Sequence, residues 1–141
     1  MKIYPKESFM VIAKAGKQIT FSLPNKMGLA AEMASAFAAS KVNVTAIVGY
    51  EMGDQAEFMV MVDDGAKAKR LLRKMGAGIK DENVIVLEMP NKVGELQKST
   101  QTIADAGINI HYFYGTTGSG KTAKCVVSTS DNKKAIKILN K

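Results

Sequence analysis

The chain contains the stretch Leu23-Pro24-Asn25-Lys26-Met27-Gly28 and, 66 residues later, the related stretch Met89-Pro90-Asn91-Lys92-Val93-Gly94. The same spacing aligns Val42-Asn43-Val44 with Ile108-Asn109-Ile110, and Met59-Val60-Met61 with Cys125-Val126-Val127. Solenoid units are usually shorter than this. The repeat therefore indicates a duplicated domain, and two equivalent sites favour binding and regulation over catalysis.

Each copy is predicted to contain a strand, a helix, two strands and a second helix. In the first copy the hydrophobic periodicity predicts strands at 19–23, 42–50 and 57–62 and helices at 27–40 and 66–75. In the second copy it predicts strands at 84–89, 108–114 and 123–129, a helix at 94–106, and a last helix capped by Asp131. The pattern changes from alternating to helical at the same place in both copies, so the copies should share one fold.

This order predicts an α+β fold of two ferredoxin-like (βαββαβ) domains in tandem, with antiparallel sheets and helices on one side of each sheet. The second copy lacks a fourth strand at its end. We expect residues 8–14, joined to Ile19 by a turn at Ala15-Gly16-Lys17, to form a hairpin with the first strand and to complete a permuted arrangement. Whether residues 79–80 or the strand from Val84 serve both domains stays open. The expected domains are 1–78, with the extra N-terminal strand, and 79–141.

Composition favours a cytoplasmic protein that does not enter a membrane. The sequence shows no secretory signal and no apolar run long enough to span a bilayer. The single cysteine excludes an internal disulfide and fits a reducing compartment. The net charge of +7 permits attraction to anions, although the basic residues at 66–75 and in the last helix are typical of solvated helix faces.

The Asn-Lys-x-Gly turns and the asparagine in each Val/Ile-Asn-Val/Ile segment resemble those of tandem ACT-domain proteins, whose ferredoxin-like domains regulate metabolic enzymes. The resemblance covers about residues 19–139 and is strongest at 90–114, PNKVGELQKSTQTIADAGINIHYFY. It implies binding of a small ligand, most often an amino acid, at an interface between ACT units. The residues implied to bind it are Asn25, Lys26, Met27, Gly28 and Asn43 in the first copy and Asn91, Lys92, Val93, Gly94 and Asn109 in the second.

The sequence departs from this family at two points. The family often has a proline before the turn glycine, where this chain has Met27 and Val93. Its serine-binding members carry a histidine two residues before the turn asparagine, where this chain has Leu23 and Met89. Serine is therefore not a favoured ligand.

The chemistry of the turn residues also suits an amino acid. A glycine at a helix start exposes backbone N–H groups, which favour a carboxylate together with the helix dipole. An asparagine side chain can accept from an ammonium group and donate to a carboxylate. In an alternative interpretation, Asn25 and Asn91 only cap their helices, and Asn43 and Asn109 only satisfy local backbone groups.

Three patterns that suggest other functions have ordinary explanations. Residues 115–122 match the P-loop pattern G-x-x-x-x-G-K-[ST], but a strand is predicted to follow where a P-loop needs a helix. His111 is the only histidine, which excludes a histidine-rich metal site. The position of Cys125 within a predicted strand is typical of a small core residue. The aromatic run 112–114 resembles the stacking residues of RNA-binding sheets, but the neighbouring strand lacks aromatic partners.

We therefore expect a non-enzymatic regulatory or sensor protein without a cofactor or metal, whose partners are an amino acid, a second copy of the chain and possible target enzymes. Val84 and Val86 are apolar although they face away from Ile85 and Leu87, which favours a homodimer formed through the sheets. The alternative is an interaction module that regulates a metabolic enzyme or transcription factor without a ligand. Nucleic-acid binding is a third and less favoured interpretation.

Overall fold

A computed structural model of the chain describes residues 11–116 and 120–141. Its elements are β1 (Ile12–Pro24), α1 (Leu29–Ala39), β2 (Val44–Met52), β3 (Gln55–Val62), α2 (Gly65–Lys74), β4 (Gly78–Pro90), α3 (Glu95–Asp105), β5 (Ile110–Thr116), β6 (Thr122–Thr129) and α4 (Asn132–Leu139). They form two compact units. The first unit is residues 17–82, and the second unit combines residues 11–16 with the described residues of 83–141. The long strands β1 and β4 therefore each contribute to both units.

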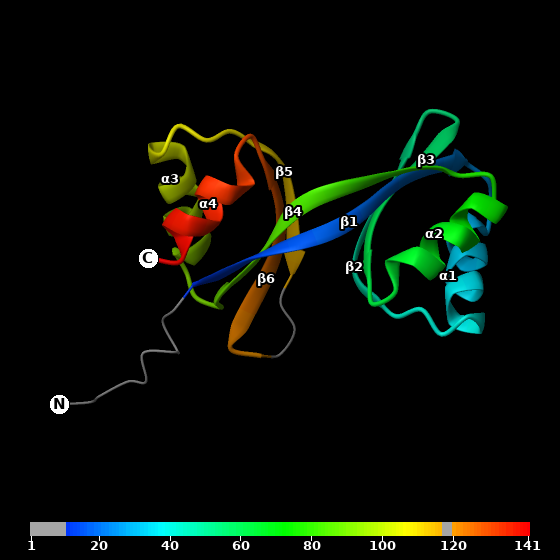
Figure 1. Cartoon of the computed structure of the whole chain (residues 1–141), viewed down its shortest axis with the longest axis horizontal. Helices are drawn as coiled ribbons and strands as arrows, with labels where there is room; N and C mark the ends of the chain where they lie inside the picture. The colour runs from blue at the N-terminus through cyan, green and yellow to red at the C-terminus, as the bar shows by residue number, and fades with distance from the viewer. Residues whose placement is uncertain (1–10, 117–119) are drawn as a thin grey trace. The chain divides into compact units, whose positions relative to one another are not determined.

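The first unit follows the order βαββαβ and has neighbouring strands in the order β2-β3-β1-β4. Strand β3 pairs antiparallel with both β1 and β2. Helices α1 and α2 contact each other and lie over one face of these strands (Figure 1). The core between helices and strands is built mainly from Ile19, Phe21, Leu23, Met33, Phe37, Phe58, Val60 and Leu72.

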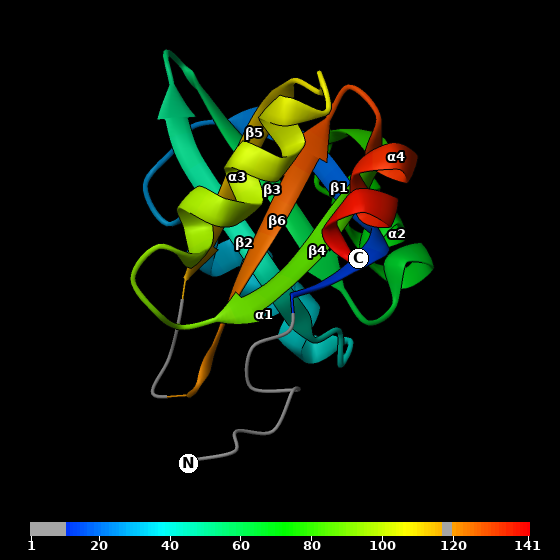
Figure 2. The ribbon, with the colours of Figure 1, turned by 90° about the vertical axis from the view of Figure 1, so that its left-hand side faces the viewer.

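The second unit has neighbouring strands in the order β1-β4-β6-β5, with antiparallel pairing of β4 and β5 to β6. Helices α3 and α4 lie side by side over one face (Figure 2). As predicted, Asp131 caps α4, and its side chain accepts a hydrogen bond from the Lys134 N–H at 3.1 Å. The core includes Ala13, Ile85, Leu87, Ile103 and Val127.

The predicted hairpin at Ala15-Gly16-Lys17 is wrong, because β1 runs without a turn from Ile12 to Pro24. Gly16 is not among the glycines with positive φ, so its backbone stays extended. The strand instead passes from one core to the other: Ala13 is buried in the second unit and Ile19 in the first. Residues 12–16 therefore provide the second unit with the strand that its C-terminal end lacks; residues 8–10 lie outside the described residues.

The side chain of Asn140 holds the start of β1 against the end of α4. Its Oδ1 accepts a hydrogen bond from the Ala13 N–H at 2.7 Å, and its Nδ2 donates one to the Ala13 carbonyl at 2.9 Å. The amide thus pairs with an edge-strand backbone as a neighbouring strand would. Both groups belong to the second unit, whose discontinuous segments they join.

Corresponding residues of the two copies lie 66 positions apart at the first strand and 67 positions apart at the third. The predicted alignment of Met59-Val60-Met61 with Cys125-Val126-Val127 is therefore wrong by one position. Val60 pairs with Ile19, and the residue that pairs with Ile85 is Val127. Nine residues separate the paired residues Gly115 and Cys125, one more than the eight that separate Gly49 from Phe58, and part of the longer segment lies outside the described residues. A shift of one residue moves a side chain to the other face of the sheet. Phe58 therefore corresponds to Cys125.

Candidate functional site

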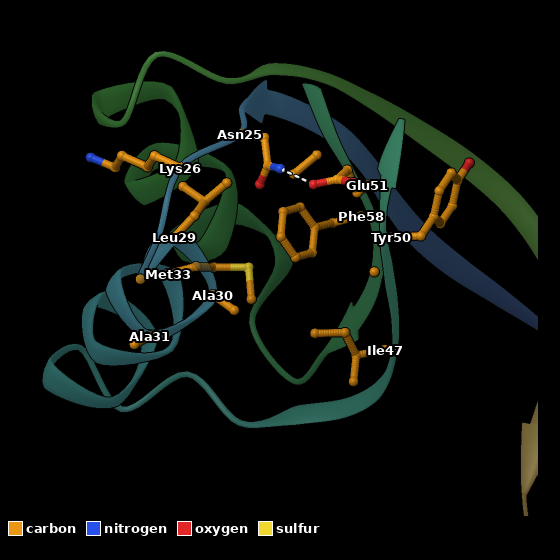
Figure 3. Close-up of a pocket in the computed structure, with 13 residues that line it drawn as sticks. Asn25, Lys26, Leu29, Ala30, Ala31, Met33, Ile47, Tyr50, Glu51 and Phe58 are labelled. Atoms are coloured by element: carbon orange, nitrogen blue, oxygen red, sulfur yellow. Dashed lines mark hydrogen bonds between the residues drawn. The ribbon is translucent and has the colours of Figure 1, made fainter. Parts of the chain in front are cut away.

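A pocket with a volume of about 510 Å³ lies in the first unit, between the start of α1 and strands β2 and β3. Its lining includes the turn residues Asn25, Lys26 and Gly28, the helix residues Leu29, Ala30, Ala31 and Met33, and the strand residues Ile47, Gly49, Glu51 and Phe58. Figure 3 shows Asn25, Leu29, Met33, Ile47, Glu51 and Phe58 around the space between helix and strands, whereas Lys26 and Tyr50 point away from it. The pocket thus joins a helix start to two neighbouring strands.

The turn that enters α1 is fixed by its backbone. The Asn25 N–H donates to the Asp54 carbonyl at 2.8 Å, which ties the turn to the β2–β3 connection. Gly28 occupies the position before α1 with φ +82°, a left-handed conformation that strongly favours glycine. Because Gly28 has no side chain, a small molecule can approach the first turn of the helix.

A polar pair marks one side of the pocket. The Asn25 amide donates from Nδ2 to Glu51 Oε2 at 2.7 Å, and Figure 3 shows the two side chains directed at each other. Asn25 therefore does not cap α1, whose start has no side-chain cap. Lys26 points outward and forms an ion pair with Glu32 at 2.9 Å. Glu51 thus supplies an exposed carboxylate and Asn25 an amide oxygen at the pocket edge.

The floor of the pocket is apolar. The rings of Phe58 and Phe21 stack with their centroids 5.0 Å apart and an interplanar angle of 16°. Gly49 leaves room for this arrangement, because a Cβ added there would lie 2.8 Å from the Phe58 ring. Leu29 and Met33 are buried beside the ring from the helix side. The floor can therefore hold an apolar group next to the polar edge.

The other residues predicted for the first site lie elsewhere. Met27 is fully exposed and is not part of the lining. Asn43 lies just before β2, at the opposite end of that strand from Glu51. Its N–H donates to Asp63 Oδ1 at 2.9 Å, and its carbonyl accepts from the Asp63 N–H at 3.1 Å. The structure thus brings Asn25, Lys26 and Gly28 together at the pocket and places Asn43 in a local contact with Asp63.

The second copy repeats the backbone geometry of the turn. The Asn91 N–H donates to the Lys121 carbonyl at 2.8 Å, and Gly94 has φ +93° before α3. Val93 is fully exposed, as Met27 is. The Lys92 N–H donates to the Pro90 carbonyl at 2.9 Å.

Asn109 corresponds to Asn43. Its N–H donates to the Ser130 hydroxyl at 2.9 Å, and its carbonyl accepts from the Ser130 N–H at 2.9 Å. The contact made by an aspartate in the first copy is thus made by a serine in the second. Both asparagines fix the connection before the second strand of their copy.

Sequence reasoning missed Gly49, Glu51 and Phe58 as pocket residues. A signal existed for the glycine, because Gly49 and Gly115 recur at the 66-residue spacing. None existed for Glu51, whose counterpart falls in the connection between β5 and β6. These residues join the site only through strand pairing.

Two features that suggested other chemistry, Cys125 and the P-loop-like stretch, lie at or beside strand β6. Burial raises the pKa of the Cys125 thiol, so the thiol stays protonated near neutral pH and is a poor nucleophile. Among the described residues, no three His, Cys, Asp or Glu side chains are grouped to hold a metal ion. The P-loop-like stretch is followed by strand β6, and residues 117–119 within it lie outside the description. No described helix is long and apolar enough to cross a membrane.

A hydrogen bond from Lys69 to Asp81 pairs one of the cations of α2. Lys69 Nζ lies 2.9 Å from Asp81 Oδ2, and this bond is the main reason why the pKa of Asp81 is lowered. Lys67 Nζ donates to the Ser40 carbonyl at 3.0 Å. Two of the basic side chains of this helix are thus engaged within the first unit.

Comparison with known proteins finds one family match and several similar structures. Residues 17–76 match the ACT domain family. A protein from Bacteroides thetaiotaomicron is similar in structure, with a TM-score of 0.82, 27% identity and coverage of 90% of this chain and 88% of that chain. The regulatory subunit of aspartate kinase from Thermus thermophilus has a TM-score of 0.64 at 19% identity, over 92% of this chain and 93% of that chain.

The corresponding subunit from Thermus flavus gives a TM-score of 0.63 at 18% identity, over 92% of this chain and 94% of that chain. No curated protein matches the sequence. The ACT match lies within the first unit, whereas the structural similarity extends over most of the chain. The two aspartate kinase subunits share the fold.

Proposed function

We propose that the chain is a regulatory protein of two ferredoxin-like ACT domains in tandem, which correspond to the two units. The match of residues 17–76 to the ACT family supports this for the first unit. For the second unit the support is the repeated turn and the same order of helices and strands. In this proposal the first unit carries an amino-acid site.

The observation that carries the proposal is the pocket at the start of α1, which offers a separate surface to each part of an amino acid. The exposed first turn of the helix favours a carboxylate through its N–H groups and its dipole. The Glu51 carboxylate, beside Asn25, suits the α-ammonium group. Phe58 and Ile47 suit an apolar side chain. An α-amino acid with an apolar side chain meets all three requirements.

Binding would act by population shift. A ligand that contacts two surfaces favours the packing in which it reaches both. It can shift the equilibrium between two packings only by the difference in its affinity for them.

The exposed side chains of Ile47, Tyr50 and Met52 on β2 support association with a second copy or a target enzyme. Light scattering at micromolar concentration should give the mass of a dimer, and a monomer would contradict the homodimer.

The test is calorimetric titration of the protein with the common amino acids. We expect an apolar amino acid to bind, and Glu51→Gln to weaken its binding by about tenfold or more, because a charge-assisted hydrogen bond is lost. Glu57→Gln is the matched control, since Glu57 lies on β3 of the same unit and does not line the pocket. The affinity of the Glu57→Gln variant for the amino acid should equal that of the wild type.

Two results would contradict the amino-acid proposal. One is the absence of heat from every amino acid, which would favour the ligand-independent interaction module. The other is unchanged affinity in Glu51→Gln, which would place binding elsewhere. A gel shift with RNA that weakens as salt is raised would instead support nucleic-acid binding.

A further inference from the structure

A second cavity, with a volume of about 320 Å³, lies in the second unit and shares no residue with the pocket described above. It is bounded by α3, the end of α4 and the start of β1. Glu95 and Ser99 line it from α3, Ile138 and Leu139 from α4, and Val11 from the chain before β1. Lys98, Thr102, Asn140 and Lys141 complete the lining, so the cavity combines polar and charged side chains with aliphatic walls.

The two polar side chains occupy positions that are apolar in the first copy. At the 66-residue spacing, Glu95 corresponds to Leu29 and Ser99 to Met33. Glu95 is only 8% exposed and Ser99 only 3%. Burying polar groups costs free energy unless they find partners. Burial at these positions is therefore less favourable in the second copy than in the first.

These groups are incompletely satisfied within the described chain. Glu95 Oε1 forms an ion pair with Lys98 Nζ at 3.2 Å, but the Lys98 side chain is 71% exposed. The Ser99 hydroxyl is buried and has no hydrogen-bond partner among the described residues. Because residues four apart share a helix face, the carboxylate and hydroxyl lie on the same side of α3. Together they offer acceptors to a buried donor.

The end of α4 favours a positive charge in the cavity, whereas Lys98 and Lys141 of the lining oppose one. The cavity touches the C-terminal end of α4, where the helix dipole is negative. Asn140 lines the cavity, but both polar atoms of its amide are bound to the Ala13 backbone. Lys98, the cation bound to Glu95, is largely exposed, so it can move aside for the ammonium group of a ligand.

We propose that this cavity binds a small aliphatic primary amine. The ammonium group donates to the Glu95 carboxylate and the Ser99 hydroxyl, and the hydrocarbon part contacts Val11 and Leu139. A simple amine and an α-amino acid share this chemistry. An amino acid adds a carboxylate, for which the lining offers two cations, Lys141 and, once the ligand has taken its place at Glu95, Lys98.

The test is calorimetric titration with n-butylamine and, separately, L-norleucine, both at neutral pH. The protein is the full chain with Glu51→Gln, so that binding in the pocket of the first unit is weakened and contributes less heat. We expect binding of n-butylamine and a loss of about tenfold or more in affinity in Glu95→Gln, because the charged acceptor is removed. Ser99→Ala should weaken binding several-fold. Glu32→Gln, the same substitution in the first turn of α1, is the control and should change nothing.

Each outcome decides the proposal. Binding of n-butylamine that falls in Glu95→Gln and Ser99→Ala supports an amine site, and tighter binding of norleucine identifies an amino acid as the better source. If norleucine alone binds and depends on Glu95, the site requires the carboxylate and the simple-amine source is excluded. No heat from either probe, or equal affinity in Glu95→Gln, would overturn the proposal. Ser99→Ala removes an unpartnered buried hydroxyl and should fold, so it provides a test even if Glu95→Gln does not.

Discussion

Gly115→Ala is expected to lower the free energy of unfolding by about 3 kcal/mol, the upper part of the range for overpacking a closely packed site. Gly115 lies opposite Cys125 in the β5–β6 pair. A Cβ at Gly115 would lie 2.4 Å from the Lys124 carbonyl oxygen and 2.5 Å from Cys125 Sγ. The first of these atoms belongs to the backbone, so it cannot rotate away as a side chain could. Urea unfolding followed by far-UV circular dichroism measures the loss.

Gly78→Ala is the matched control for this substitution. Gly78 begins β4, its φ is not positive, and a Cβ there would meet no atom within 4 Å. Alanine should leave stability unchanged or raise it by up to about 1 kcal/mol, because it restricts the unfolded chain. Equal losses at Gly115 and Gly78 would show that close packing is not the cause.

Phe58→Ala is expected to cost about 3–5 kcal/mol of the free energy of unfolding, the usual range for a buried aromatic side chain. Phe58 is 7% exposed, stacks on Phe21 and forms the floor of the pocket. Its removal leaves a cavity under a site that is already open to solvent. The same urea experiment measures the loss, and amino-acid titration of the folded variant should show weaker binding.

Phe113→Ala tests whether burial causes the effect. Phe113 is also in a strand but is 49% exposed. Its substitution should cost less than about 1 kcal/mol, because little apolar surface returns to water. A loss at Phe113 as large as that at Phe58 would contradict the role assigned to the buried ring.

Sequence predicts the parts of the fold that depend on local signals. The cap at Asp131 and the two glycine turns were placed correctly, because capping groups and positive φ leave a mark on neighbouring residues. The length of β4 was not predicted. Its first residues, 78–83, are mostly polar and resemble a loop, yet they continue a strand that neighbours β1 in the sheet. Backbone pairing of this kind leaves no periodic apolar pattern.

The candidate site shows the same division. Asn25, Lys26 and Gly28 were predicted because they are repeated in the sequence, whereas Met27, predicted for the same reason, lies outside the pocket. Glu51 and Phe58 were not, since their contacts with Asn25 and Phe21 depend on the pairing of separate strands. The cavity at Glu95 was also missed. The signal for it was the exchange of two apolar helix positions for polar ones, which is visible only when the copies are compared residue by residue.

The continuous strand β1 also has a consequence for how the protein is made. The first unit occupies one uninterrupted segment, residues 17–82, inserted between the two segments of the second. On the ribosome the inserted unit can finish folding while the sequence for α3 to α4 is still being translated. Residues 12–16 can pack only after the rest of the second unit, which is synthesised last, has emerged. The folded first unit already holds its two ends close together, so the loop-closure cost of joining the two segments of the second unit is reduced. The order of synthesis thus favours completion of the pocket at the start of α1 before that of the cavity beside α3 and α4.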